Sequence, residues 1–381
     1  MTRCRFETRA IHDGQDPDPT TGAVVPPIYQ TSTFQQSAPA EHKGYEYART
    51  GNPTRTALEA CLASLEEGQF GLAFASGMAA ITATAYLLSP GDHAVLPDDV
   101  YGGTYRLFVR VLERYGIASS FVDMTDLTRV EAALTPKTRM VLTETPTNPY
   151  LKIFDIAAIS ELAHARDALV VVDNTFASPY FQRPLSLGAD LVVHSTTKYL
   201  GGHSDVVGGA VVINSKDIYQ TLKFYQNAAG AVPSPFDCWL VLRGVRTLGI
   251  RMDRHAANAI AVAESLRDNP AVTRVFYPGF PEHPGHDIAR KQMSGFGGMV
   301  SFVVRGGLES ARRVASSTKI FILGESLGGV ESLLDHPASM THASLAGSSL
   351  QVDGGLIRLS VGIEHVHDLV DDLQQALAKV R

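Results

Sequence analysis

Residues 168–202, ALVVVDNTFASPYFQRPLSLGADLVVHSTTKYLGG, are the stretch that decides the expected fold. They hold two short apolar runs, 169–172 and 191–193, which are rich in β-branched residues. Such runs are typical of strands in a parallel sheet that helices cover on both faces. Polar and ionisable residues follow each run, beginning with Asp173 and His194. Because ligands bind beyond the carboxyl ends of such strands, we expect a functional site there.

The same pattern extends outward, from about residue 56 to about residue 215. Further runs that read as strands are 94–96, 140–142 and 210–213. Stretches with helical periodicity lie around them, at 56–66, 78–88, 101–115, 127–134 and 156–165. In the last of these, Asp155 is the expected N-cap. Alternating strands and helices predict an α/β domain with a large, doubly wound, mostly parallel sheet.

We expect three segments along the chain. Residues 1–55 lack periodicity and are rich in Pro, Thr, Gly and Gln, which favours an arm that contacts a neighbouring subunit. Residues 56–242 form the large sheet domain, which should hold the ligand. Residues 243–381 contain a long helical stretch at 249–267 and two strand-like stretches, so we expect a smaller α+β domain.

Composition argues against several classes of protein. The 381 residues are 45% hydrophobic and 19% charged, which is ordinary for globular domains. A net charge of −6 gives no sign of binding to nucleic acid or to an anionic membrane. The three cysteines are far apart, no apolar signal sequence is visible, and no run approaches roughly 18 apolar residues. We therefore expect a protein of the reduced cytoplasm.

The lysine in HSTTKYLGG, Lys198, is a candidate for covalent chemistry. Partial burial lowers the pKa of a lysine, so that it can form a Schiff base with a carbonyl compound. Pyridoxal 5′-phosphate (PLP) needs such a lysine, an acidic partner for its ring nitrogen and an anion site for its phosphate. Asp173 is the candidate partner for the ring nitrogen, and Tyr101, after another strand, is a candidate to stack on the ring.

The phosphate site is expected at FASGMAA, where a loop enters a helix. Backbone N–H groups of Gly77 and Met78 at a helix N-terminus suit an anion, and Ser195 and Thr197 can add hydroxyl donors. Each signal is weak by itself, but together they supply complementary parts at the strand ends of one sheet. No metal site is expected, because the histidines of PEHPGHD lie in a loop rich in Pro and Gly without further ligands.

Motifs spread over about residues 6–379 add a resemblance to a known family. The chain resembles the Cys/Met-metabolism, or transsulfuration, family of PLP-dependent enzymes. The motifs that carry it are YEYARTGNPTR, FASGMAA, DVYGGT, ETPTNP, VVDNTFASPYFQRPLSLGAD, HSTTKYLGGHSDVVGG, ESLGGVESL, PASMTHAS and IRLSVGIE. The resemblance implies fold type I, the aspartate-aminotransferase-like fold, and a homotetramer built as a dimer of dimers with active sites shared between subunits.

The resemblance also implies roles for matching positions. Lys198, Tyr101 and Asp173 would be catalytic. The cofactor would be bound by Tyr47 and Arg49 from the neighbouring subunit and by Gly77, Met78, Tyr101, Asp173, Ser195, Thr197 and Lys198. The substrate would be bound by Arg358 at its α-carboxylate, with Asn148 and Ser326, and by Glu46, Arg106 and Glu325 at its distal end.

The activity implied by the resemblance is α,γ-elimination of L-cystathionine to L-cysteine, 2-oxobutanoate and ammonia. The alternative is γ-replacement, in which cysteine displaces the acyl group of O-succinyl- or O-acetylhomoserine. Methionine or homocysteine γ-elimination is less favoured, because Gly103 and Glu325 depart from the cysteine and the apolar residue usual in methionine γ-lyases. Cystathionine β-elimination and a non-catalytic α/β binding protein are the remaining alternatives.

Overall fold

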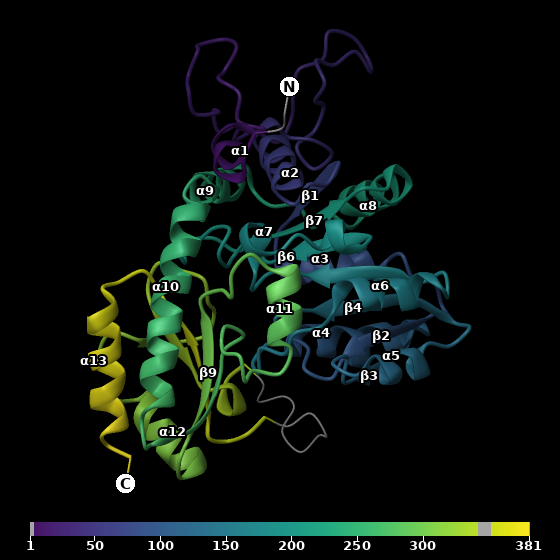
Figure 1. Ribbon diagram of the computed structural model, residues 1–381. Helices are drawn as coiled ribbons and strands as arrows, with labels where there is room; N and C mark the ends of the chain where they lie inside the picture. Colours follow the sequence, from purple (N-terminus) through teal and green to yellow (C-terminus); the bar gives the residue numbers. More distant parts are fainter. Residues whose placement is uncertain (1–3, 342–351, 381) are drawn as a thin grey trace.

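The computed structural model describes residues 4–341 and 352–380. The last three residues of the PASMTHAS motif, 342–344, lie outside the described residues. Two sheets, each packed against helices, make up most of the described chain, and much of residues 13–52 projects as loops beyond α1 and α2 (Figure 1). The outer ends of these loops carry no regular helix or strand.

The first sheet, as formed by the described residues, has seven strands in the order β1-β7-β6-β5-β4-β2-β3. Their bounds are β1 Phe70–Phe74, β2 His93–Pro97, β3 Ala118–Val122, β4 Thr138–Glu144, β5 Leu169–Asp173, β6 Leu191–His194 and β7 Gly209–Ile213. Neighbouring strands from β6 to β3 are parallel, whereas β7 runs antiparallel to both β1 and β6. The mostly parallel, doubly wound sheet of fold type I is thus confirmed, while β1 and β3 were missed in the sequence.

Helices cover both faces of this sheet, as the apolar runs predict. Their bounds are α1 Phe6–His12, α2 Pro53–Leu65, α3 Gly77–Ala85, α4 Gly102–Arg106, α5 Leu127–Ala133, α6 Ile156–His164, α7 Ser178–Phe181, α8 Lys216–Ala229 and α9 Pro235–Val245. Val171 and Val193 face one core with α3, whereas Val172 packs on the opposite face with α6. The side chain of Asp155 accepts the Ala158 N–H at 3.1 Å, so the expected cap of α6 is confirmed.

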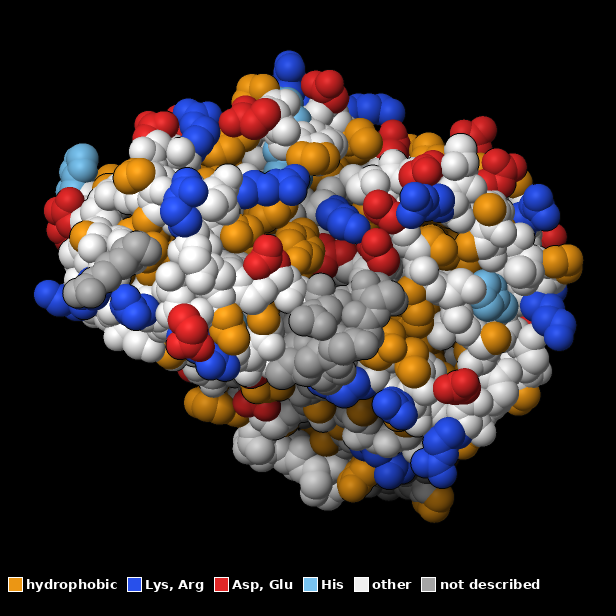
Figure 2. All heavy atoms as spheres, turned by 90° about the horizontal axis from the view of Figure 1, so that it is seen from below, with side chains coloured by type: hydrophobic (Ala, Val, Ile, Leu, Met, Phe, Trp, Pro, Cys, Tyr) orange, Lys and Arg blue, Asp and Glu red, His pale blue; other side chains and the backbone are white. Residues whose placement is uncertain are grey.

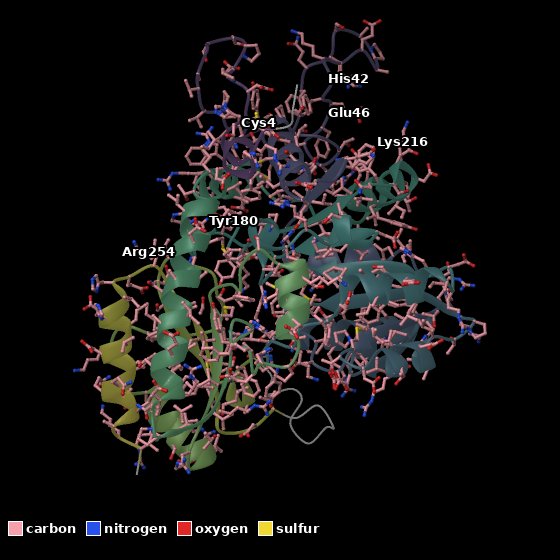
Figure 3. All side chains as sticks on the ribbon, in the orientation of Figure 1. Cys4, His42, Glu46, Tyr180, Lys216 and Arg254 are labelled. Atoms are coloured by element: carbon pink, nitrogen blue, oxygen red, sulfur yellow. The ribbon has the colours of Figure 1, made fainter. Side chains whose placement is uncertain are left out.

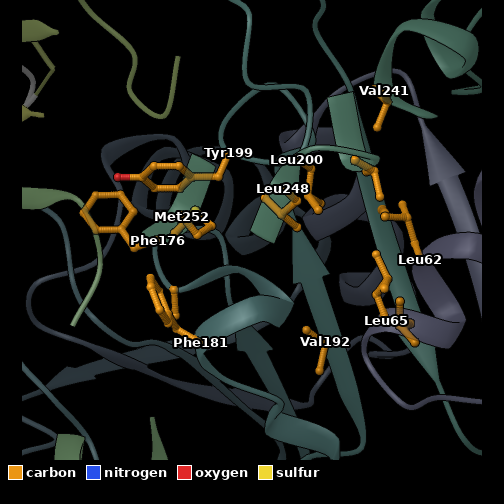
Figure 4. Close-up of a cluster of buried hydrophobic side chains, with 14 of the residues drawn as sticks. Leu62, Leu65, Phe176, Phe181, Val192, Tyr199, Leu200, Val241, Leu248 and Met252 are labelled. Atoms are coloured by element: carbon orange, nitrogen blue, oxygen red, sulfur yellow. The ribbon is translucent and has the colours of Figure 1, made fainter. Parts of the chain in front are cut away.

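The second sheet has the strand order β10-β11-β12-β9-β8 in the described residues. Its elements are β8 Val272–Phe276, β9 Met299–Val304, β10 Ile322–Leu323, β11 Leu333–Asp335 and β12 Leu356–Ser360, with helices α10 Leu248–Arg267, α11 His286–Gln292, α12 Gly307–Ala315 and α13 Val366–Leu377. Apolar side chains of α10, among them Leu248 and Met252, share one core with Tyr199 and Val192 (Figure 4). This core connects the second sheet and its helices to the first sheet.

The surface carries charges of both signs. On the face drawn in Figure 2, the Lys and Arg side chains lie among Asp and Glu side chains rather than forming a field of one sign. None of the helices in the described ranges is both long and apolar enough to cross a membrane. Within the same ranges, no group of three or more His, Cys, Asp or Glu side chains could hold a metal ion.

Candidate active site

A cavity of about 320 Å³ lies at the carboxyl ends of β4, β5 and β6, between the first sheet and residues that follow β10. Most of the expected site residues line it: Gly77, Met78, Tyr101, Asn148, Asp173, Ser195, Thr197, Lys198, Glu325, Ser326 and Arg358. They come from separate strand ends and one helix start, and the fold brings them together around one space. The cavity is therefore the candidate active site.

Lys198 lies in the turn that follows β6 and is partly buried. Its Nζ donates a hydrogen bond to Ser326 Oγ at 2.6 Å. Burial, helped by the positive charge of Arg358 and opposed by Glu325, lowers the pKa of Lys198 to about 8. An appreciable fraction of the amine is then neutral near pH 7 to 8, as a nucleophile or a base requires.

Asp173 is the last residue of β5, and its Oδ1 accepts hydrogen bonds from the backbone N–H and the hydroxyl of Thr175. Burial raises the pKa of Asp173, while the bonds from Thr175 and the charge of His194 oppose that rise. Glu144 ends the neighbouring strand β4 directly opposite Asp173. Burial and then the charge of Asp173 raise the pKa of Glu144. Two carboxyl groups so close together in a buried site do not both ionise easily.

The start of α3 forms an anion cradle. Ser76, the N-cap, accepts the Ala79 N–H at 3.0 Å, and α-helical geometry gives the N–H groups of Gly77 and Met78 no partner inside the helix. Glycine is needed here, because a Cβ on Gly77 would lie 2.8 Å from the Cβ of Ser195. Gly77, Met78 and Ser195 thus lie side by side on the wall of the cavity, and the residues present fit the phosphate of PLP.

Gly77→Ala should weaken PLP binding by about tenfold or more, because the added Cβ pushes α3 and Ser195 apart and spoils the cradle. Equilibrium dialysis of PLP against the variant and the parent measures the effect. Gly354→Ala is the matched control for losing a glycine, since its backbone φ is not positive and a Cβ there would meet Leu308 at an ordinary contact distance of 3.4 Å. Unchanged PLP affinity in Gly77→Ala would contradict the phosphate role of this cradle.

Arg358 on β12 is 2% exposed, lines the cavity and is paired with Asp335 of β11. Its Nη1 donates to Asn148 Oδ1 at 2.7 Å, its Nη2 donates to Ser326 O at 3.0 Å, and Asp335 is 3.3 Å from Nη2. Its Nε is buried and has no hydrogen-bond partner among the described residues. Arg358 lines the cavity, and a guanidinium in such a place suits a carboxylate ligand.

Tyr101 precedes α4 and is 36% exposed. Its backbone N–H donates to Glu144 Oε2 at 3.0 Å, which ties the loop before α4 to the end of β4. A Cβ on Gly103 would lie 2.4 Å from the ring of Tyr101 and 2.8 Å from Met78 Sδ. Glycine at position 103 therefore lets the tyrosine ring lie against the helix.

Four expected residues do not line the cavity: Glu46, Tyr47, Arg49 and Arg106. Glu46 lies on a projecting loop (Figure 3). Arg49 stacks on the ring of Tyr47 at 5.6 Å and donates to Asn227 Oδ1 at 3.2 Å. Tyr47 is 46% exposed, and Arg106 is exposed at the end of α4. Within one chain these residues and the cavity stay apart.

Sequence reasoning missed three residues that shape the site: Glu144, Thr175 and Asp335. Thr175 fixes Asp173 by two bonds, and Asp335 balances the charge of Arg358 in the interior. The motifs ETPTNP and DNTF contain the first two, directly at strand ends, so position could have pointed to them. No sequence signal links Asp335 to Arg358, because only the antiparallel pairing of β11 with β12 brings them together.

Comparison with known proteins extends these observations. The sequence model of the family "Cys/Met metabolism PLP-dependent enzyme" matches residues 7–378. Cystathionine gamma-synthase of Mycobacterium tuberculosis (strain H37Rv) is 59% identical over 372 residues, 97% of this chain and 96% of that protein. Cystathionine gamma-lyase of Bacillus subtilis (strain 168) is 52% identical over 377 residues, 98% of this chain and 99% of that protein.

Another similar protein has a different name, and a solved structure has the same fold. Cystathionine beta-lyase of Coxiella burnetii is 54% identical over 380 residues, 98% of each chain. The crystal structure of metB from Corynebacterium glutamicum superposes with a TM-score of 0.98 at 51% identity and covers 99% of both chains. The similar proteins thus share one fold but carry names for three different reactions.

Proposed function

The chain belongs to the Cys/Met metabolism family of PLP-dependent enzymes, and from this premise we propose that it makes or breaks the Cγ–S bond of L-cystathionine. One observation carries the proposal: the cavity that Lys198 lines is also lined by the buried Arg358 and by Glu325. Cystathionine has an α-carboxylate at one end and a distal ammonium at the other. A guanidinium and a carboxylate at different places in one cavity are complementary to both.

The residues that would hold PLP follow from the same cavity. Lys198 would attach it covalently, Asp173 would pair with its ring nitrogen, and the cradle at Gly77 and Met78 would take its phosphate. Ser195 lines that cradle. The hydroxyl of Thr197 also lines the cavity, but it donates to the carbonyl of Gly208 and accepts from the Gly208 N–H. When bound, PLP supplies an electron sink that stabilises negative charge beside the substrate amine.

We assign the other steps to this chain's own side chains. Arg358 binds the α-carboxylate, and Asn148 and Ser326 hold the guanidinium in place. Lys198, once freed, takes the α-proton at Nζ and carries protons between neighbouring carbons of the bound amino acid. Tyr101 is the proposed general acid that protonates the departing group, and its loop is held by Glu144.

Two net reactions are candidates for this site. The first is α,γ-elimination, which releases L-cysteine, 2-oxobutanoate and ammonia, as the sequence motifs imply. The second is γ-replacement, in which cysteine displaces the acyl group of an acylated homoserine. It is favoured by the 59% identity to proteins named cystathionine gamma-synthase. Both reactions use the same residues to bind the α-carboxylate and to transfer protons. They differ in whether cysteine attacks the γ-carbon.

An assay of released keto acid separates the candidates. Purified, PLP-loaded protein is given L-cystathionine, and 2-oxobutanoate and pyruvate are measured. Rapid 2-oxobutanoate would establish γ-elimination, and pyruvate would establish β-elimination. Little keto acid together with cystathionine formed from O-succinyl- or O-acetylhomoserine and cysteine would establish γ-replacement. No turnover in either assay would overturn the proposal.

We also propose a homotetramer in the cytoplasm with active sites shared between subunits. Support comes from the apolar side chains that the arm exposes, including Val24 at 75% and Val25 at 43%. The same arm carries Tyr47 and Arg49, which are remote from the cavity of their own chain. Sedimentation of the holoenzyme tests the assembly, and the three free cysteines agree with a reducing compartment.

A further inference from the structure

A buried arginine lies at the start of α2, where the arm joins the first sheet domain. Arg55 is 2% exposed and does not line the cavity. Its Nη1 donates to the carbonyl of Ala48 at 2.7 Å, and its Nη2 donates to the carbonyl of Arg49 at 2.9 Å. A buried guanidinium costs free energy unless its donors are bonded and its charge is balanced. Here two donors hold the backbone of one short segment of the arm.

The carboxylate of Glu59, one turn further along α2, balances the charge of Arg55. Glu59 Oε1 is 3.7 Å from Arg55 Nε. The same oxygen accepts the N–H of Ala73 at 3.0 Å and a side-chain N–H of Gln226 at 3.1 Å. Ala73 belongs to β1 and Gln226 to α8. Arg55 therefore has a fixed place relative to the first sheet, because the carboxylate beside it is itself bonded to a strand and a helix.

The segment that Arg55 holds carries two exposed side chains, Tyr47 and Arg49. The guanidinium of Arg49 lies over the ring of Tyr47, 5.6 Å from its centre. Residues 32–33 also hold this segment, through a backbone bridge to Tyr47 and a 2.9 Å bond from the Ala48 N–H. The backbone of the segment is thus fixed, although neither exposed side chain lines the cavity of its own chain.

We propose that Arg55 is a positioning residue, which fixes the segment so that Tyr47 and Arg49 reach the PLP phosphate in the cavity of a second copy of this chain. The inference rests on the proposed sharing of active sites between subunits. A hydroxyl and a guanidinium that lie together suit a phosphate. Because their backbone is already fixed, less conformational entropy is lost when they bind it.

The test begins with Arg55→Lys, which keeps a positive charge beside Glu59 but lacks the planar fork that donates to two carbonyls. Its affinity for PLP, measured by equilibrium dialysis, should fall by about tenfold or more. Sedimentation and the melting temperature show whether the variant still folds and assembles. Arg55→Met combined with Glu59→Gln replaces it if it does not fold, because that pair leaves no buried charge without its partner.

Co-expression with Lys198→Ala shows in which chain the loss arises. The Lys198→Ala chain has an intact arm but cannot hold PLP covalently, whereas the Arg55→Lys chain keeps its lysine. Hybrids are purified through different tags on the two chains, and borohydride traps PLP on the Arg55→Lys chain at limiting PLP. The trapped amount should rise toward that of the parent, because the intact arm now serves this cavity. No rise would place the defect within one chain, for instance along β1 to its own phosphate cradle, and would overturn the proposal.

Arg49→Ala in the same pairing separates this inference from the shared active site on which it rests. Arg49→Ala should also weaken PLP trapping and should also be rescued by the Lys198→Ala chain. An Arg49→Ala variant that binds PLP like the parent, or that is not rescued, would overturn the shared site itself. Rescue of Arg49→Ala without rescue of Arg55→Lys would overturn only the role of Arg55.

Arg251→Lys is the matched control. Arg251 is 4% exposed and likewise donates to two backbone carbonyls, those of Tyr199 at 2.7 Å and Gly244 at 2.8 Å, which lie outside the arm. PLP trapped on this variant should be the same with and without the Lys198→Ala chain. A gain equal to that of Arg55→Lys would show that hybrids merely stabilise a weakened fold, and would overturn the proposal.

Discussion

Lys198→Ala is expected to lose covalently bound PLP and to lower turnover by a factor of about 10³ or more. Two contributions disappear together: the amine that attaches the cofactor and the base that takes the α-proton. The structure places the amine beside Ser326 in a cavity that lowers the pKa of Lys198 to about 8. Turnover of L-cystathionine, or of an acylated homoserine with cysteine, and borohydride trapping of the cofactor measure both losses.

Lys198→Arg sharpens this experiment, because it keeps the positive charge and much of the length but cannot form the covalent link. It should fail as Lys198→Ala does. Lys291→Ala, at a side chain that is 71% exposed, is the control for removing a lysine and should behave like the parent. Near-normal turnover in either variant at position 198 would remove the basis of the proposed function.

The pKa of Lys198 gives this prediction a pH dependence. Only the neutral amine attacks a carbonyl, and its fraction increases as pH rises toward and through about 8. The rate at which apo-protein regains covalently bound PLP should therefore rise steeply between about pH 6.5 and pH 8 and flatten above it. A rate that still climbs tenfold per pH unit up to pH 10 would show an ordinary, unshifted lysine.

Arg358→Lys should weaken capture of the amino-acid substrate by about 100-fold while PLP stays bound. A lysine keeps the charge but cannot make the paired, planar contact that a guanidinium offers a carboxylate. The bonds to Asn148 and Ser326 that hold the arginine would also be lost. Substrate affinity is measured by titrating the cofactor absorbance with the amino acid, and cofactor affinity is measured separately by dialysis.

Arg358→Ala is a harsher change, because it leaves the buried Asp335 without its cation. Breaking a buried ion pair in this way costs about 3–5 kcal/mol of stability. Arg358→Gln combined with Asp335→Asn removes both charges and should restore the melting temperature without restoring substrate binding. Equal losses of PLP and substrate affinity in Arg358→Lys would contradict a role confined to the substrate carboxylate.

Most strands of the first sheet could be predicted from the sequence, because strands that are buried on both faces consist of short runs of apolar, β-branched residues. β5 and β6 were placed to within one residue, and so was the long helix α10. β3 was missed because ASSFV is polar and lies at the edge of the sheet, where only one neighbour pairs with it. The antiparallel direction of β7 was missed because an apolar run indicates a strand but not the direction in which it runs.

The sequence by itself determined the fold class, the family and the types of groups at the strand ends, Asp173 and Lys198 among them. These follow from local order, since each group directly continues its own strand. Only the tertiary structure decided how distant segments meet: Asp335 against Arg358, Glu66 against His194, and Glu144 against Asp173. The physical reason is that the burial of these charges and their partners depends on packing between elements, which local sequence does not encode.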